Sequence, residues 1–138
     1  MTTHCPCLSG IPLDECCGPL LRGETLAPTA EQLMRSRFSA FAVGNADYLL
    51  ATWHPSTRPP TLQLDLERRW YRLDIIKRTA GGPLDTRGTV TFEAFWRSGD
   101  DRGAQRELSD FARENGRWFY VAALDLGAGA ATPASPVN

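Results

Sequence analysis

The chain has 138 residues, 42% of them hydrophobic, and its 15 basic and 16 acidic residues leave a formal net charge of -1. This size fits one ordinary domain with a core of its own. The balanced charge gives no general attraction to nucleic acid, so we expect no nucleic-acid partner. No apolar run approaches the roughly 20 residues of a membrane helix, and the N-terminus lacks the basic flank and apolar run of a signal peptide. We therefore expect a cytoplasmic protein.

The composition divides the chain into three parts. Residues 1–24 are rich in Cys, Gly and Pro and hold too few large apolar residues to form a core unaided. Residues 25–126 carry helix and strand patterns and should form the main domain. Residues 127–138 are small and Pro-rich, which is typical of a disordered tail.

Two helices are expected at the start of the main domain. Thr29 can cap the first helix and Gln32 can reach back to it, as in a capping box. Gly44 suits the end of this helix. A second, short helix should begin after Asn45 and stop near Trp53, because a proline two residues later disfavours helical geometry before it. The first helix has an apolar face at helical spacing, made by Met34, Phe38, Phe41 and Ala42.

In the second half of the chain the apolar spacing changes to two, which predicts antiparallel strands separated by turns. The first strand should place Tyr71, Leu73 and Ile75 on one face and should end at a Gly-Gly-Pro turn. The third should span about 105–113, and the last should cover 118–124 after an Asn-Gly hairpin turn. Helices followed by such a meander indicate an α+β fold. A strongly curved sheet that wraps the helices would bury both of its aromatic faces.

All four cysteines fall within residues 4–18, HCPCLSGIPLDECCG, as Cys5, Cys7, Cys16 and Cys17. Disulfides are rare in the cytoplasm, so clustered thiols there indicate metal ligands. A tetrahedral zinc site takes four thiolates, and metal binding can supply the folding energy that a segment without a core lacks. We therefore expect one structural zinc ion per chain. The alternatives are two disulfides, although a Cys16–Cys17 bridge would be strained, a nucleophilic thiol, or His4 in place of one cysteine ligand.

Residues 4–20, HCPCLSGIPLDECCGPL, resemble the SEC-C motif, a small zinc-binding element found on many unrelated proteins. Its usual form is Cys-Pro-Cys-Gly-Ser-Gly, a short spacer, and then Cys-Cys or Cys-His. Leu8 stands where glycine is usual, and the spacer at residues 11–15 lacks the usual lysines. The second departure weakens any transfer of ribosome or acidic-partner binding to this chain.

Residues 33–59, LMRSRFSAFAVGNADYLLATWHPSTRP, are similar to the signature of the YchJ-like family of uncharacterised bacterial proteins. GTVTFEAFWR at 88–97 and ENGRWFYV at 114–121 fit the same family. The resemblance implies a nuclear-transport-factor-two-like, or cystatin-like, cone in which helices pack into the concave side of a curved antiparallel sheet. A small N-terminal zinc-binding element would precede this cone. Such a cone often leaves a pocket, but the family brings no established biochemical function.

Six side chains are candidates for a pocket in the cone: Arg35, Arg37, Asp47, Trp53, His54 and Glu93. His54 could act as a general base because its unperturbed pKa lies near neutrality, although we favour a structural role at the helix end. Asp47 or Glu93 could pair with it only if the fold brings them close. The two arginines point about 200° apart on a helix, so one of them can enter the concave side, unless it forms a structural ion pair.

Three functions fit these features. The first is a protein-interaction or adaptor module, with a protein partner docked on the zinc element and a possible small-molecule ligand in the cone. The second is a small hydrolase-like or isomerase-like enzyme that uses His54, and the third is a thiol-based redox or zinc sensor. We favour the first, non-enzymatic function, because four thiolates leave no open position on the metal. A homodimer through the sheet face is also possible.

Overall fold

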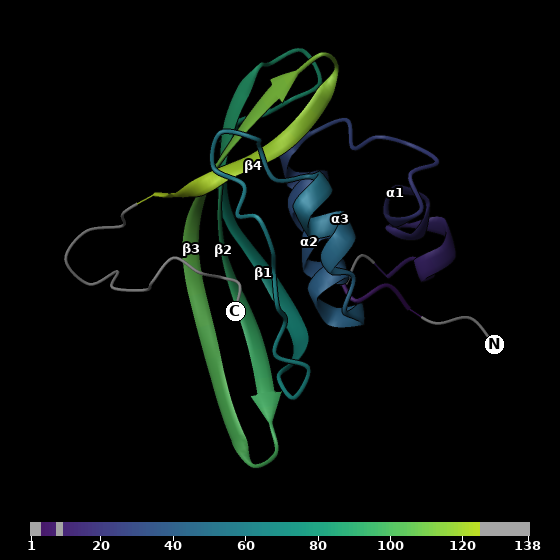
Figure 1. Ribbon diagram of the computed structural model, residues 1–138, viewed down its shortest axis with the longest axis vertical. Coiled ribbons are helices and arrows are strands. Elements are labelled where there is room, and N and C mark those ends of the chain that lie inside the picture. The colour runs from purple at the N-terminus through teal and green to yellow at the C-terminus, as the bar shows by residue number, and fades with distance from the viewer. Residues whose placement is uncertain (1–3, 8–9, 125–138) are drawn as a thin grey trace.

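The computed structural model describes residues 4–7 and 10–124, so the tail predicted at 127–138 lies outside the described residues. Figure 1 shows helices on one side of a twisted antiparallel sheet, with the N-terminal element on the far side of the helices. The predicted α+β architecture is therefore confirmed. No helix within the described ranges is both long and apolar enough to cross a membrane.

Two short helical segments and two longer helices precede the sheet. The N-terminal element holds η1 (Leu13–Glu15) and α1 (Gly18–Leu21), and the main domain begins with α2 (Ala30–Val43) and α3 (Ala46–Ala51).

Local cap chemistry sets the ends of these helices. The hydroxyl of Thr29 accepts a hydrogen bond from the backbone amide of Gln32 at 3.1 Å. The Gln32 side chain binds the Thr29 hydroxyl rather than its backbone amide, so only half of the predicted capping box forms. Gly44 ends α2 with a φ of 78°, and Asn45 caps α3.

The sheet is a four-stranded meander in the order β1-β2-β3-β4. Its strands are β1 (Arg69–Ala80), β2 (Arg87–Ser98), β3 (Asp101–Glu114) and β4 (Arg117–Leu124). The predicted Asn115-Gly116 turn is present, with both residues at positive φ. The third strand begins earlier than predicted, at Asp101 rather than near 105, and with β2 it forms the long hairpin at the bottom of Figure 1.

The first strand departs from the predicted alternation because it is bulged. Its register against β2 shifts between Trp70 and Arg72, so Tyr71 is the extra residue. Trp70, and not Tyr71, therefore shares the inner face with Leu73 and packs on the core. Tyr71 lies on the outer face, where its ring is 6.5 Å from that of Phe95.

Only one face of the sheet is covered by the helices. The core forms between α2 and this inner face and includes Leu33, Phe38, Val90, Phe111 and Trp118. The outer-face aromatic residues stay partly exposed, so the expectation that both aromatic faces are buried is wrong. These outer rings are covered instead by arginine side chains; Arg97, for example, lies 4.4 Å above the ring of Tyr71.

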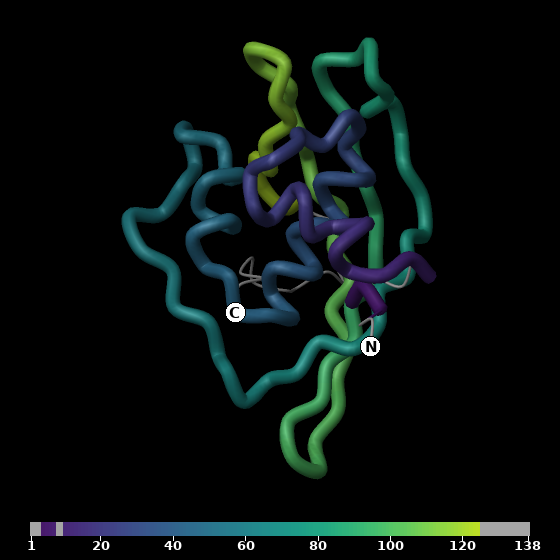
Figure 2. Tube along the Cα trace, turned by 90° about the vertical axis from the view of Figure 1, so that its right-hand side faces the viewer, coloured from purple at the N-terminus to yellow at the C-terminus, as the bar shows by residue number. Residues whose placement is uncertain are grey.

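Helix α2 connects the two parts of the molecule. Figure 2 shows the N-terminal segment lying against α2 on the side away from the sheet, while the connection between α3 and β1 runs round the edge of the domain. Side chains on opposite sides of α2 therefore reach two different environments: the cysteine cluster and the concave face of the sheet.

Candidate metal centre and concave pocket

Backbone hydrogen bonds fold the N-terminal element back on itself. The amide of Cys5 donates to the carbonyl of Ile11 at 3.0 Å, and His4 bridges to Pro12 in the same ladder. Gly10 makes the intervening turn with a φ of 84°. The chain that carries the first two cysteines therefore faces the start of α1, where the other two lie.

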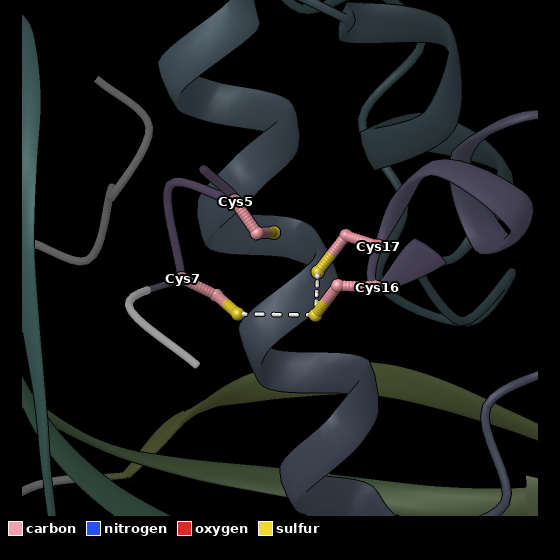
Figure 3. Close-up of side chains that lie close together, drawn as sticks. All are labelled: Cys5, Cys7, Cys16 and Cys17. Atoms are coloured by element: carbon pink, nitrogen blue, oxygen red, sulfur yellow. Dashed lines mark hydrogen bonds between the residues drawn. The ribbon is translucent and has the colours of Figure 1, made fainter. Parts of the chain in front are cut away.

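The four cysteine side chains converge on one point beside α2 (Figure 3). Their sulfur atoms all lie within 4.8 Å of one another. The sulfurs of Cys7 and Cys16 are 3.6 Å apart, and those of Cys16 and Cys17 are 4.0 Å apart. Four sulfurs held about 2.3 Å from a tetrahedral metal would lie about 3.8 Å from one another. The cluster therefore fits the dimensions of a single tetrathiolate metal ion.

Burial and oxidation state also suit a metal site. None of these four cysteines forms a disulfide. Cys5, Cys7 and Cys17 are at most 3% exposed, while Cys16 is partly exposed. The hydrogen bond with Cys7 and then burial raise the pKa of the Cys17 thiol far above its ordinary value. Thiolates crowded in this way need a cation to balance their charge, which a bound divalent metal would supply.

Two contacts fasten the cluster to α2. The sulfur of Cys5 lies 3.4 Å from the hydroxyl of Ser39, and a guanidinium nitrogen of Arg35 donates to the carbonyl of Cys7 at 3.0 Å. Arg35 also pairs with Glu31, one turn earlier on the helix. Arg35, predicted as a pocket candidate, therefore supports the metal element instead. His4 is exposed and does not belong to the group of side chains that could hold the metal.

The side chain of His54 forms two hydrogen bonds at the end of α3 and does not line the concave pocket. One ring nitrogen binds the carboxylate of Glu114 at 2.8 Å, and the other binds the hydroxyl of Ser56 at 2.7 Å. Its ring also packs on Phe119. These contacts fasten the loop after α3 to the β3–β4 hairpin. The carboxylate partner is thus neither Asp47 nor Glu93.

The other candidates are dispersed. Asp47 lines a separate groove between α3 and the linker after α1. Glu93 lies on the outer sheet face, 3.4 Å from Arg106. The ring of Trp53 packs edge-on against Tyr120. Of the six pocket candidates, only Arg37 lines the pocket between α2 and the inner sheet face.

The cavity in this concave pocket has a volume of only about 30 Å³. Aromatic and aliphatic side chains from α2 and the sheet make most of its wall, among them Met34, Phe41 and Phe92. Phe38 and Trp70 fill the middle of the cone with an edge-to-face contact at 6.4 Å. The pocket is therefore small and apolar, with a few polar groups at its inner end.

Arg37 is the positive group at the inner end. It is 3% exposed and donates to the carbonyl of Leu49 at 2.8 Å and to the hydroxyl of Thr52 at 2.7 Å. Its guanidinium carbon lies 4.5 Å above the ring of Tyr120. Burial lowers the pKa of Arg37 to about 10, and attraction to Glu107 is among the opposing effects. Arg37 remains charged at neutral pH.

Glu107 is the negative group at the same end. It is 5% exposed, and its Oε2 accepts hydrogen bonds from Ser109 at 2.5 Å and from the hydroxyl of Tyr120 at 3.1 Å. Its other oxygen, Oε1, is buried and has no hydrogen-bond partner. Burial raises the pKa of Glu107, while the hydrogen bonds from Ser109 and Tyr120, the charge of Arg37 and a hydrogen bond with the Gln105 side chain oppose the rise.

Comparisons with known proteins agree with this fold and cysteine cluster. A family model described as the YchJ middle NTF2-like domain matches residues 29–123. A UPF0225 protein from Corynebacterium glutamicum is 54% identical over 120 residues, which cover 87% of this chain and 95% of the relative. The chain belongs to the YchJ-like family. Another member, a UPF0225 protein from Streptomyces coelicolor, is 47% identical over 87% of this chain and 94% of its own length.

Two solved structures share this YchJ-like fold. The solution structure of a SEC-C motif containing protein from Rhodopseudomonas palustris is 32% identical, with a TM-score of 0.74 over 90% of this chain and 98% of the other. The crystal structure of a SEC-C motif containing protein from Psychrobacter arcticus is 26% identical, with a TM-score of 0.67 over 94% and 84% of the two chains. The predicted family and fold are therefore confirmed, and the four cysteines of this chain could hold a metal ion.

Glu107 lines the pocket of this YchJ-like chain but is not among the six side chains predicted for it. Strand alternation could have found it. Phe111 belongs to the core, and counting back in twos along β3 places Ser109 and Glu107 on the same inner face. A glutamate on the inner face must be buried, unless the strand bends to expose it.

The raised pKa of Glu107 predicts a pH dependence of stability. The folded state holds this proton more tightly than the unfolded state does, so the free energy of unfolding falls as pH rises from about 4.3 through the folded pKa. Wild type should therefore gain stability, relative to Glu107→Gln, when the pH is lowered from 7 to 5. Urea unfolding of both proteins at several pH values measures this difference, because effects of the shared cysteine site cancel. Parallel pH profiles for the two proteins would contradict the prediction.

Proposed function

We propose that this protein is a protein-interaction module whose N-terminal element is held together by one structural zinc ion. The observation that carries the proposal is the convergence of four cysteine sulfurs, three of them from buried residues, within 4.8 Å. A tetrahedral set of four thiolates favours zinc among the common metals. The SEC-C motif in the names of the two structural relatives supports the same choice.

A structural role for the metal follows from the ligand set. Catalytic zinc sites keep one position open for water or substrate, whereas four cysteines close the tetrahedron. The cysteines also form the small core of the element, where they pack with Leu13 and Leu21. The metal would therefore shape a surface and would not take part in a reaction.

The surface shaped in this way suits a protein partner. Ile11 is 44% exposed at the turn of the element, and Glu15 is exposed close to it in sequence, as is Asp14, which pairs with Arg22 at 3.7 Å. An exposed aliphatic side chain flanked by acidic groups complements a segment that carries an apolar residue and basic neighbours. We propose such a segment as the docking partner.

Affinity capture with the full, zinc-loaded chain tests the proposal. Wild type should capture a defined protein from a lysate of the source organism, and Cys16→Ser and Ile11→Asp should lose it. Leu84→Asp is the matched control, because Leu84 is 92% exposed in the β1–β2 connection and should not matter. Circular dichroism checks that the main domain of each variant stays folded. Equal capture by wild type and Ile11→Asp would contradict docking on this surface.

A further inference from the structure

We infer that the outer face of the sheet, close to the β2–β3 turn, binds a single-stranded nucleic acid through a row of three arginines and two neighbouring aromatic rings. This is the face of the sheet that the helices leave uncovered (Figure 1). The inference goes beyond the proposed docking function and stands independently of it, because the metal element lies on the side of α2 away from the sheet.

The arginine row consists of Arg69, Arg97 and Arg102, which stand side by side across β1, β2 and β3. Arg69 is paired with Arg97, and Arg97 is paired with Arg102. Residues directly opposite one another in a sheet share a face, and Arg97 lies on the outer face because its guanidinium covers the ring of Tyr71. All three arginines are exposed, and Arg69, at the edge of the sheet, also borders a groove beyond the end of α2. Since neighbouring strands are about 4.8 Å apart, the row brings three positive charges together across about 10 Å of the sheet.

No acidic side chain neutralises this row. None of its three arginines forms an ion pair with a residue in the described ranges, and the two aspartates at 100–101, next to the row, form none either. Two other arginines of the outer face do have acidic partners: Arg72 pairs with Asp74 at 3.0 Å, and Arg106 lies 3.4 Å from Glu93. Like charges directly opposite one another destabilise a sheet. An anionic ligand would offset this repulsion.

Two aromatic rings lie beside the row on the same face. The guanidinium carbon of Arg97 is 4.4 Å above the ring of Tyr71, and that of Arg72 is 4.8 Å above the ring of Phe95. The two rings are 6.5 Å apart, and both residues are partly exposed. Unpaired bases stack on aromatic side chains and on guanidinium planes. The rings and the guanidinium groups that cover them therefore offer surfaces for bases, while the arginine row offers donors for phosphates.

This combination favours a single strand over other anionic partners. An acidic protein segment would match the arginine row, but its carboxylates make no use of the rings of Tyr71 and Phe95. In a duplex the bases are stacked on one another, so they do not reach these rings. The sequence-based expectation of no nucleic-acid partner rests on the balanced charge of the whole chain, which does not report how charges are arranged on one face.

Fluorescence anisotropy of a labelled oligouridine of about 12 nucleotides, titrated with the full-length protein, tests the inference. Contact of the arginine row with three phosphates should make the logarithm of Kd rise with the logarithm of the salt concentration with a slope of about 2. A duplex RNA of the same length and a glutamate peptide of the same charge should each bind at least about tenfold more weakly. No binding of oligouridine at about 50 mM salt, or a slope near zero, would overturn the inference. Equal binding of the glutamate peptide would overturn it too, and would assign the row to an acidic protein segment.

Matched variants locate the binding surface. Arg97→Gln/Arg102→Gln removes two charges of the row and should lower the salt slope to about 0.7. Arg58→Gln/Arg117→Gln is the control: it removes the same charge from exposed positions, with Arg117 at the opposite end of the β3–β4 hairpin from the row, and should keep the wild-type slope. Tyr71→Ala should weaken binding about tenfold, because it removes a stacking surface. If Tyr71→Ala does not fold, the arginine variants still decide the question. Equal slopes for the two double variants would contradict binding at the row.

Discussion

Chelation of the proposed zinc ion at neutral pH should unfold the N-terminal element, residues 4–7 and 10–24 of the described chain, while the main domain stays folded. The N-terminal element has its own small core, in which Cys5, Cys7 and Cys17 are the buried members. The main core lies between α2 and the sheet and contains none of these residues. Because a segment of this size depends on its metal for folding energy, chelation should remove its structure. The main domain has enough apolar burial of its own.

The expected cost to the main domain comes from two polar contacts and one apolar contact. Loss of the element removes the Cys5 contact of Ser39, the hydrogen bond from Arg35 to the carbonyl of Cys7, and the packing of Leu20 on the main core. At about 1 kcal/mol for each, the main domain should lose about 3 kcal/mol of unfolding free energy. Elemental analysis should find about one zinc ion per chain before chelation. NMR should then show lost dispersion for residues 4–24 and shifted amides near Ser39.

Two variants separate metal loss from general damage. Cys16→Ser/Cys17→Ser should bring the zinc content close to zero, because two thiolates are too few for a structural site. Ser39→Ala removes the neighbour of Cys5 and leaves all four thiols, so it should retain zinc. Stoichiometric zinc in the double cysteine variant would contradict the site. A wild-type protein without zinc, with four titratable thiols or two disulfides, would instead favour the redox function.

Features set by neighbouring residues could be predicted from the sequence. The caps of α2 depend on Thr29 and Gly44, each of which acts within one helical turn. The existence of the cysteine cluster could also be predicted. The Cys-x-Cys and Cys-Cys pairs are separated by a short spacer, so they can come together only if the chain between them reverses direction. The carbonyl and amide contacts that produce this fold, such as Cys5 to Ile11, could not be read from residue types.

Features that depend on distant pairing could not be predicted in the same way. The bulge at Tyr71 places Trp70 on the inner face. The residues on either side of the bulge, Trp70 and Arg72, do not indicate it, because residue type alone does not show which residue is the extra one. The acidic partner of His54 is Glu114, 60 residues later, and is brought close only by the β3–β4 hairpin. The placement of Arg37 and Glu107 in the wall of one pocket likewise requires α2 to lie across the sheet.

Substitution of Arg37 by methionine should destabilise the main domain by about 3 to 5 kcal/mol. Arg37 is buried, and its removal deletes the hydrogen bonds to Leu49 and Thr52. It also removes a positive charge that attracts Glu107, and a hydrogen bond to a charged group contributes about 1.5 to 3 kcal/mol. Methionine keeps most of the volume and the apolar contacts, so the loss reports on the charge and the hydrogen bonds.

Urea unfolding of matched variants measures this effect and assigns it. Arg35→Met is the control on the same helix: it removes a partly exposed arginine that pairs with Glu31 and binds the carbonyl of Cys7, and it should cost only about 1 to 2 kcal/mol. In Arg37→Met/Glu107→Gln the buried acid is neutral, so the double variant should be less destabilised than the sum of its single changes. Strict additivity would show that the two side chains act independently. If Arg37→Met loses no more unfolding free energy than Arg35→Met, the charge of Arg37 does not stabilise the main domain. Arg37 projects from α2 and Glu107 from β3. A double variant that is less destabilised than the sum of the single variants would therefore mean that these two side chains help to hold α2 in place across the sheet.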